Sequence, residues 1–441
     1  MLLIKNGVIV DPVKHQEIQA DIFIQNGRIK KIDKKLDEKK LAEEFGNSHR
    51  EQRGEEKGIQ VLDASGKKIG PGLVDVHVHF RDPGFTHKED ILTGAKAAAK
   101  GGFTTVVLMA NTRPAVDNEE TLAYVLNKGK ETEIHVETCG TITKGLKGRE
   151  LTDMQALKSM GAVGFTDDGI PLMNKVLLEQ AMLTAKELGV PVSLHEEDPA
   201  FIENNGVNAG KAAAYFGIGG SGRKAEISLI ERDVELALKT GASLNVQHIS
   251  TKEGVEIVRK GKKRGDNIHA EATPHHFTLT EEAVIEKGTM AKMNPPLREE
   301  EDRMAIIEGL KDGTIDLIAT DHAPHAKEEK DKPLTEAPSG IIGLETAFGL
   351  AVTNLVLPGH LTLTELFEKM SLNPAKLYHL PAGTIEEGAE ADLIIFDEKE
   401  QYVFREEDIC SKSHNTPFIG ATLQGKIDAT IVKGAIVYQA N

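Results

Sequence analysis

Short apolar runs alternate with longer helix-like stretches through the middle of the chain, and this alternation constrains the fold more than any other feature. The runs begin near Gly70, and we expect strands at 73–78, 104–109, 134–139, 162–166, 191–195, 243–248, 268–272 and 316–320. Stretches rich in Ala, Leu, Lys and Glu lie between them and predict helices, including 88–100, 174–188, 224–239 and 299–310. Continuous apolar strands separated by helices are typical of a parallel sheet covered by helices.

Eight such units over roughly 250–300 residues is the count of a (β/α)8 barrel. A doubly wound open sheet is the main alternative, but no G-x-G-x-x-G follows the first strand, which weakens its dinucleotide-binding version. We therefore predict an α/β fold with a barrel over residues 70–380.

The two chain ends have a different, β-type pattern. Apolar and polar residues alternate near the amino terminus, where the pairs Asn6-Gly7 and Asn26-Gly27 suit tight hairpin turns. Alternation returns after Leu380, so we expect residues 1–69 and 381–441 to form one small β-sandwich domain beside the barrel. The densely charged run 34–57 is interpreted as a solvated surface insertion, either a short helix or a mobile loop.

Composition excludes several classes of protein. The 441 residues carry a net charge of -16, which argues against a nucleic-acid-binding or anionic-membrane surface. No run approaches the ~20 apolar residues of a spanning helix, and the start lacks the pattern of a secretory signal. Two cysteines, Cys139 and Cys410, cannot build a disulfide framework, so we expect a cytoplasmic protein.

Ligand-type side chains stand at the carboxyl ends of the predicted strands. His77 and His79 end the first strand, and alternation puts both imidazoles on one face. The fourth, fifth, sixth and eighth strands end in or run into Asp167-Asp168, His195, His248 and Asp321. In a barrel those ends meet at one mouth, so we predict a site for zinc or a similar metal. A structural role is the alternative, above all for the aspartates, because Asp-Asp-Gly forms turns.

The motifs GPGLVDVHVHFRDPG, MANTRP, GFTDDG, MNPPLR and ATDHAPH resemble those of the dihydroorotases, long bacterial type, in the amidohydrolase superfamily. The resemblance implies a metal-dependent hydrolase barrel holding one or two Zn²⁺ ions, with two expected. The ligands it implies are His77, His79, Asp168, His195, His248 and Asp321. Many relatives bridge two metals with a carboxylated lysine after strand four, where this chain has aspartates. Asp168 fits that bridge better than Asp167 by its spacing to His195.

The implied reaction is the reversible cyclisation of N-carbamoyl-L-aspartate to L-dihydroorotate in pyrimidine synthesis. A bound cation lowers the pKa of water to ~7, and the resemblance makes Asp321 both a ligand and the proton carrier. Arg81 lies two residues beyond His79 and shares its direction, and its guanidinium can hold a carboxylate through two hydrogen bonds. The substrate contacts implied by the resemblance are His79, Arg81, Asn111, Asn294, His325, Ser339 and Gly340.

Three further readings remain open at the level of sequence. One is a related cyclic-amide hydrolase, an allantoinase or hydantoinase. Another is a non-catalytic scaffold for aspartate transcarbamoylase, which the full ligand set argues against. An active enzyme that associates with further copies of this chain or with aspartate transcarbamoylase is the third. The other histidines in or near the barrel are interpreted as structural: His87, His135, His269, His275 and His276.

Overall fold

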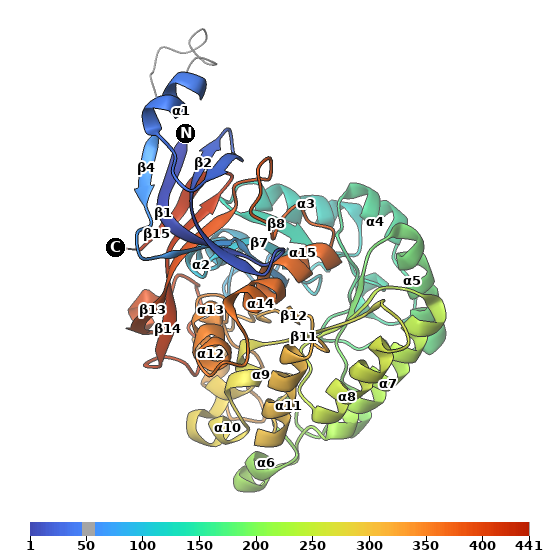
Figure 1. Ribbon diagram of the computed structural model, residues 1–441. Helices are drawn as coiled ribbons and strands as arrows, with labels where there is room; N and C mark the ends of the chain where they lie inside the picture. Colours follow the sequence, from blue (N-terminus) through green and yellow to red (C-terminus); the bar gives the residue numbers. More distant parts are fainter. Residues whose placement is uncertain (46–57, 441) are drawn as a thin grey trace.

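The computed structural model describes residues 1–45 and 58–440, and a barrel of parallel strands ringed by helices forms its centre (Figure 1). The barrel strands are β6 (Leu73–Val78), β7 (Phe103–Leu108), β8 (His135–Thr138), β9 (Val192–Leu194), β10 (Leu244–Val246), β11 (Ile268–Ala272) and β12 (Leu317–Ile318). Every ladder among them is parallel. A parallel bridge between Val78 and His322 closes the ring. The (β/α)8 prediction is therefore confirmed.

The predicted fourth strand, 162–166, is reduced to isolated bridges. Phe165 pairs with Gly140 on one side and with Val192 on the other. The segment fills the strand's place, since Ser193 N donates to Phe165 O at 3.0 Å, but it forms no regular ladder. Within this segment Gly164 packs close to Tyr378, since a Cβ there would lie 2.9 Å from the Tyr378 ring.

Helices cover the outside of the barrel, and the four predicted ones end within a few residues of their expected limits. The longer helices are α2 (Ile91–Lys100), α3 (Glu119–Gly129), α4 (Met154–Met160), α5 (Lys175–Leu188), α7 (Arg223–Thr240), α8 (Lys252–Lys262) and α11 (Glu300–Lys311). The shorter ones are α6 (Lys211–Phe216), α9 (Pro274–Thr278), α10 (Glu282–Lys287), α12 (Lys327–Lys330), α13 (Ala347–Ala351), α14 (Leu363–Phe367) and α15 (Asn373–Leu377). Single turns complete the set: η2 (Lys144–Leu146), η3 (Pro199–Phe201), η4 (Gly288–Ala291), η5 (Val352–Val356), η6 (Glu368–Leu372) and η7 (Glu406–Asp408). None of the helices described has the length and apolar character needed to cross a bilayer.

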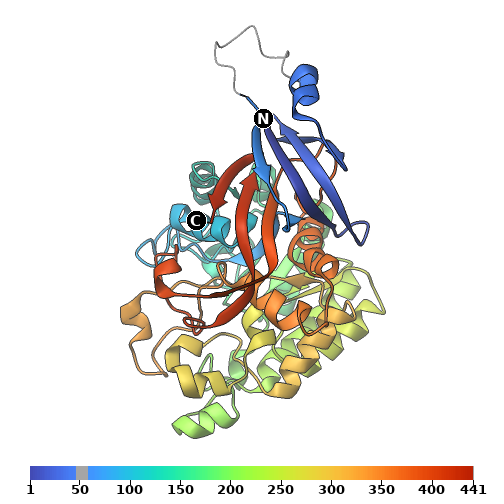
Figure 2. The same cartoon turned by 60° about the vertical axis from the view of Figure 1, so that its left-hand side comes forward.

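Strands from both chain ends pair into one sheet beside the barrel, and Figure 2 shows these blue and red strands next to one another. They are β1 (Leu2–Asp11), β2 (Gln16–Gln25), β3 (Arg28–Asp33), β4 (Gln60–Asp63), β5 (Lys68–Pro71), β13 (Leu393–Val403), β14 (Thr422–Val432) and β15 (Ala435–Gln439). The order is β15-β14-β13-β5-β1-β2-β3, with β4 on β1. Ile4, Ile22, Ile69, Leu393 and Ile431 are buried in one cluster, so strands from both ends share a core. The division at 69/70 falls within β5, and the three segment limits stay predictions.

Of the two predicted Asn-Gly turns, one is confirmed and one is wrong. Asn26 and Gly27 have φ of 52° and 76° and connect β2 to β3. Asn6 also has positive φ, 64°, but it lies inside β1, where the register with β2 shifts between Ile4 and Gly7. An extra residue in one strand of an antiparallel pair makes a β-bulge. Residues that tolerate the positive φ of a tight turn also tolerate the positive φ of a bulge.

The described part of the charged run, residues 34–45, is mostly exposed. It contains α1 (Glu38–Phe45), whose Leu41 is buried with Leu36 against Leu3 and Phe23 of the sheet. This part is a short helix on the surface, one of the two alternatives, and two leucines among its exposed charged residues anchor it to the sheet. Residues 46–57 lie outside the described residues.

Candidate metal centre

Histidine and aspartate side chains converge at the carboxyl ends of the barrel strands. The set is His77 in β6, His79 just after it, Asp168 after the Phe165 bridge, His195 after β9, His248 after β10 and Asp321 after β12. None is more than 8% exposed. The structure thus brings together all six residues predicted from the sequence.

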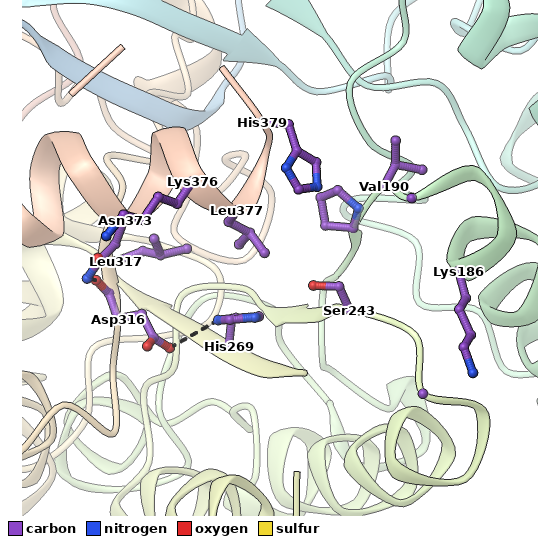
Figure 3. A pocket seen from close by; sticks show the side chains of 13 residues that line it. Lys186, Val190, Ser243, His269, Asp316, Leu317, Asn373, Lys376, Leu377 and His379 are labelled. Carbon is purple, nitrogen blue, oxygen red and sulfur yellow. Dashed lines mark hydrogen bonds and ion pairs between the residues drawn. The ribbon is translucent and has the colours of Figure 1, made fainter. Parts of the chain in front are cut away.

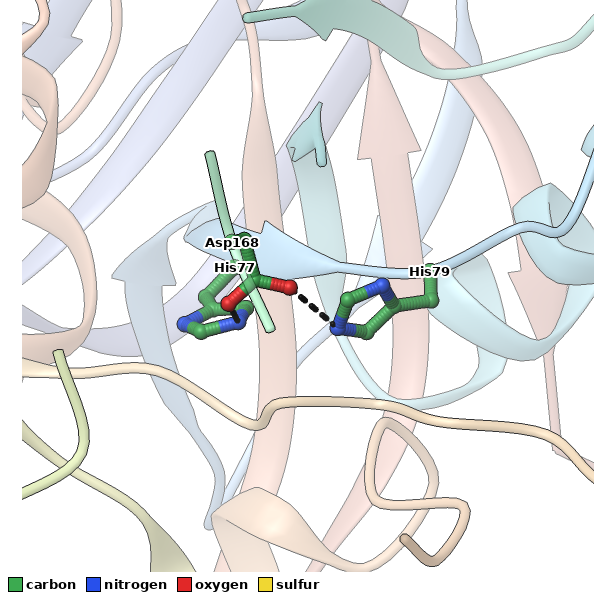
Figure 4. Close-up of side chains that lie close together, drawn as sticks. All are labelled: His77, His79 and Asp168. Carbon is green, nitrogen blue, oxygen red and sulfur yellow. Dashed lines mark ion pairs between the residues drawn. The ribbon is translucent and has the colours of Figure 1, made fainter. Parts of the chain in front are cut away.

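Asp168 lies at the middle of this cluster. Its Oδ1 is 3.4 Å from His77 Nε2, and its Oδ2 is 3.5 Å from His79 Nε2 (Figure 4). The same Oδ1 is 3.9 Å from His195 Nδ1. On the other side, Asp321 Oδ1 lies 3.0 Å from His79 Nε2 and 3.5 Å from His77 Nε2. One carboxylate therefore faces three imidazoles that come from two separate parts of the chain.

The donor set fits a divalent metal. Three overlapping groups each hold three ligand atoms within 4.8 Å of one another: His77, His79 and Asp168; His77, His248 and Asp321; Asp168, His195 and His248. His77 Nε2 is buried and has no hydrogen-bond partner in the part of the chain that the structure describes. A buried polar atom without a partner is costly, and a metal ion would satisfy it. Imidazole and carboxylate ligands suit zinc and its first-row neighbours.

The electrostatics of the cluster favour a cation. Burial raises the pKa of Asp168, but His77, His79 and His195 outweigh it and hold that pKa below its usual range. Burial lowers the pKa of His77, yet the carboxylates of Glu271 and Asp168 raise it well above its ordinary value. Negative charge thus concentrates around His77, where positive charge is stabilised.

Two of the candidate ligands, His77 and His79, are each oriented by a second contact. His77 Nδ1 lies 2.5 Å from Glu271 Oε1, and His79 Nδ1 lies 3.0 Å from Asn111 Oδ1, so both rings direct Nε2 into the cluster. Contacts of this kind fix the tautomer and orientation of metal-binding histidines. Glu271 was not predicted as a site residue. The available signal was an acidic residue within the apolar strand 268–272.

Backbone conformation also marks the cluster. Arg81, His248 and Asp321 have φ of 59°, 30° and 48°. A non-glycine residue in this region is strained and persists only where its surroundings hold it. Here each of these residues follows a barrel strand, so the chain turns sharply to direct the side chain across the mouth.

The two adjacent aspartates point to different partners. Asp167 Oδ1 accepts hydrogen bonds from Ile142 N at 2.8 Å and Thr143 N at 3.0 Å, and its Oδ2 accepts one from Thr143 Oγ1. Asp168 alone faces the histidines. Asp167 therefore anchors the 142–143 turn beside the cluster.

The predicted substrate residues form a connected group next to the centre. Arg81 Nε donates to Pro324 O at 3.2 Å, and its Nη2 lies 3.4 Å from His325 Nε2. That same ring nitrogen is 2.9 Å from Ser339 O. Gly340 follows with φ of 122°, and a Cβ there would lie 2.7 Å from Ala323 Cβ, so the position requires glycine. Burial lowers the pKa of His325 to about 2, with Arg81 adding to the effect, so this imidazole is neutral.

The two predicted asparagines contact candidate ligands. Asn111 Nδ2 donates to Asp168 Oδ2 at 2.9 Å while its Oδ1 faces His79, so its amide holds two ligands in place. Asn294 Nδ2 lies 3.2 Å from His195 Nε2. The Asn294 amide oxygen is buried and unpaired among the described residues, which leaves an acceptor beside the cluster.

Two buried lysines that the sequence did not suggest hold the segment carrying Ser339 and Gly340. Lys330 Nζ donates to Pro338 O and Gly340 O, both at 3.0 Å. Lys292 Nζ donates to Leu334 O at 2.7 Å and Ala337 O at 2.6 Å. Burial, together with the nearby charge of Lys292, lowers the pKa of Lys330 to about 7. No sequence pattern marks either lysine.

A separate pocket of about 410 Å³ lies at the opposite, amino-terminal ends of the barrel strands (Figure 3). Residues at the starts of β9 to β12 line it, among them Ser243, His269 and Asp316. His269 Nδ1 is 3.7 Å from Asp316 Oδ2. This pocket does not adjoin the candidate metal centre.

Comparison with known proteins identifies the family. Residues 69–437 match the amidohydrolase family. Dihydroorotases of Clostridioides difficile (strain 630) and Clostridium acetobutylicum are 54% and 50% identical to this chain, each match covering 100% of both chains. The solved L-hydantoinase (dihydropyrimidinase) from Arthrobacter aurescens is 26% identical, with a TM-score of 0.85 over 99% of this chain and 96% of its own. The chain belongs to the amidohydrolase family and, within it, groups with the dihydroorotases.

Proposed function

We propose that this chain is a dihydroorotase, which interconverts N-carbamoyl-L-aspartate and L-dihydroorotate with release or uptake of water. The observation that carries the proposal is the 54% identity to a dihydroorotase over the full length of both chains. The hydantoinase likeness is much weaker, at 26% identity. A cyclic-amide hydrolase with a carboxylate-bearing ring as substrate accounts for both findings.

The metal would be held at overlapping positions. Three overlapping groups of ligand atoms would hold it: His77, His79 and Asp168; His77, His248 and Asp321; Asp168, His195 and His248. Asp168 would be shared, because it belongs both to the group with His77 and His79 and to the group with His195 and His248. When bound, zinc lowers the pKa of water to ~7 and polarises a carbonyl oxygen.

Proton transfer falls to Asp321. In the hydrolytic direction, water adds to a ring carbonyl carbon, the adjacent carbon–nitrogen bond breaks, and the nitrogen takes up the proton that the water lost. The Asp321 carboxylate faces the cluster at 8% exposure, so it can accept that proton and return it to the nitrogen. In the synthetic direction the same carboxyl group runs both transfers in reverse.

Arg81 and His325 would hold the substrate carboxylate. Arg81 is the positive group beside the cluster, and two of its guanidinium nitrogens already face carbonyl and imidazole acceptors. A planar guanidinium is suited to bidentate binding of carboxylates. Asn294 and the backbone at Ser339 would contact the ring. These contacts favour dihydroorotate over hydantoin, which carries no carboxylate.

Turnover of three substrates by the purified, zinc-loaded chain tests this function. We expect hydrolysis of dihydroorotate, with little or none of hydantoin and allantoin. Preferential hydrolysis of either alternative would replace the proposal, and loss of all three activities in a chain with full metal content would support the scaffold reading. Metal analysis of the same sample separates a demetallated enzyme from an inactive one.

Association remains a prediction for this chain. Light scattering of the purified protein tests for homo-oligomers, and activity with and without added aspartate transcarbamoylase tests for that partner. A cytoplasmic location is likewise a prediction, which fractionation of the source cells tests.

A further inference from the structure

A second group of metal-ligand side chains lies where the barrel meets the sheet of the chain ends. His135 begins β8, so it stands at the opposite end of the barrel from Asp168 and its neighbours. Glu390 and Asp392 come from the segment that leads into β13 of the sheet. Two parts of the fold thus bring one imidazole and two carboxylates together, outside the candidate metal centre.

The distances within this group suit one shared ion. His135 Nε2 lies 2.8 Å from Asp392 Oδ2 and 3.6 Å from Glu390 Oε2. The three ligand atoms all lie within 4.8 Å of one another. Donor atoms around one small divalent cation, each about 2.0–2.2 Å from it, are separated by comparable distances.

The closest pair is not joined by a hydrogen bond. Among the residues that the structure describes, neither His135 Nε2 nor Asp392 Oδ2 has a hydrogen-bond partner, although both atoms are shielded from solvent and only 2.8 Å apart. Asp392 is 5% exposed. Two sheltered polar atoms that approach closely without pointing at each other are arranged as co-ligands are, around a common centre.

The remaining atoms of the carboxylates are held in position. Asp392 Oδ1 accepts a hydrogen bond from Lys433 N at 2.8 Å, which leaves Oδ2 available as a ligand beside His135. The Asp392 carbonyl accepts one from Gly72 N at 2.9 Å. Glu390 Oε1 lies 3.8 Å from Arg28 Nη2, which leaves Oε2 facing inward. These contacts orient the two carboxylates before any ion binds. Hydrogen bonds from neighbouring groups to the ligands have the same effect in known metal sites.

We propose that His135, Glu390 and Asp392 form a peripheral site for a divalent first-row cation such as zinc, which links the barrel to the sheet. One neutral imidazole and two carboxylates match the ligand preference of zinc and balance its charge. Because the ligands come from β8 and from the segment before β13, the ion stabilises the contact between those two parts. The site takes no part in turnover.

Glu390→Gln provides the discriminating test, because it removes a charged ligand while keeping the His135–Asp392 pair. Wild type and variant are dialysed against the same buffered free zinc, and bound metal and melting temperature are measured. We expect the variant to hold one ion fewer per chain, and added zinc to raise its melting temperature less than that of the wild type. Dihydroorotate turnover at saturating zinc should be unchanged.

His269→Gln is the matched control, since His269 pairs with Asp316 at the same end of the barrel (Figure 3) but, among residues 1–45 and 58–440, belongs to no group with a second carboxylate. It should hold as much zinc as the wild type. Equal metal content and equal zinc-dependent stabilisation in wild type and Glu390→Gln would overturn the proposal and leave a simple ion pair at His135. Absence of dihydroorotate turnover in the wild type would refute the proposed function without changing this metal count.

Discussion

Replacing Lys330 with Met should change the stability of the protein in a pH-dependent way. Lys330 is 1% exposed, and burial lowers its pKa to about 7, with the charge of Lys292 adding to the effect. In the unfolded chain a lysine has a pKa of about 10.4. Between these two values the unfolded state binds a proton that the native state does not, so the free energy of unfolding rises with pH.

The size of the effect follows from the two pKa values. Each pH unit between them contributes up to about 1.4 kcal/mol, and the contribution between about pH 7.5 and about pH 9 sums to about 2 kcal/mol. Lys330→Met lacks this titration. The stability difference between wild type and variant should therefore grow by about 2 kcal/mol over that interval. Loss of the bonds to Pro338 O and Gly340 O adds a constant cost.

Urea unfolding of both proteins at the two pH values measures this difference, with metal held constant. Lys186→Met is the control, because Lys186 also donates to a carbonyl, Thr240 O at 2.9 Å, but is exposed. Its effect should be the same at both pH values. A Lys330→Met difference that is constant, or that shrinks as pH rises, would refute a neutral buried lysine. The variant should also raise the KM for dihydroorotate, because Lys330 holds the segment carrying Ser339.

Five further variants, in three comparisons, test the centre. His77→Ala or His79→Ala should lower turnover on the order of 100-fold or more and reduce bound zinc with the circular dichroism unchanged; near-normal turnover with full zinc would exclude this site. Arg81→Lys keeps the charge but loses the planar fork, so kcat/KM for dihydroorotate should fall about tenfold or more, and an unchanged value would remove Arg81 from the pocket. Asp168→Ala should lower zinc content and turnover together, while Asp167→Ala should keep its zinc and lose ~1–3 kcal/mol of stability; the reverse pattern would move the bridge to Asp167.

The position of the centre could be predicted because it depends on regular geometry. Alternation along one strand places His77 and His79 on the same face, and parallel strands bring His195, His248 and Asp321 to one mouth. Neither inference needs a side-chain contact. The residues that orient the ligands could not be found this way. Glu271 contacts His77 across 194 residues of sequence, and only the closed barrel brings the two together.

Local signals failed where tertiary packing decides the outcome. Asn6-Gly7 and Asn26-Gly27 are the same dipeptide, and both asparagines adopt positive φ. One forms a turn and the other a bulge, because β1 continues past Gly7 to pair with β5. A Cβ on Gly7 would lie 2.5 Å from the Ile69 side chain of β5. The position therefore requires glycine so that Ile69 can pack against β1.

Pairing of the chain ends also bears on the substrate side of the centre. Asn415 lies between β13 and β14, in the carboxyl-terminal segment, yet its Oδ1 accepts a hydrogen bond from His325 N at 3.1 Å. Its Nδ2 donates to Ala323 O and Gly340 O, both at 3.0 Å. One amide therefore joins the segment after Asp321 to the segment around Ser339. β13 pairs with β5, which immediately precedes the first barrel strand. This pairing holds the carboxyl-terminal segment beside the barrel, where Asn415 reaches these carbonyls. The split sheet thus places Asn415 where it links the two segments that carry the predicted substrate contacts His325, Ser339 and Gly340.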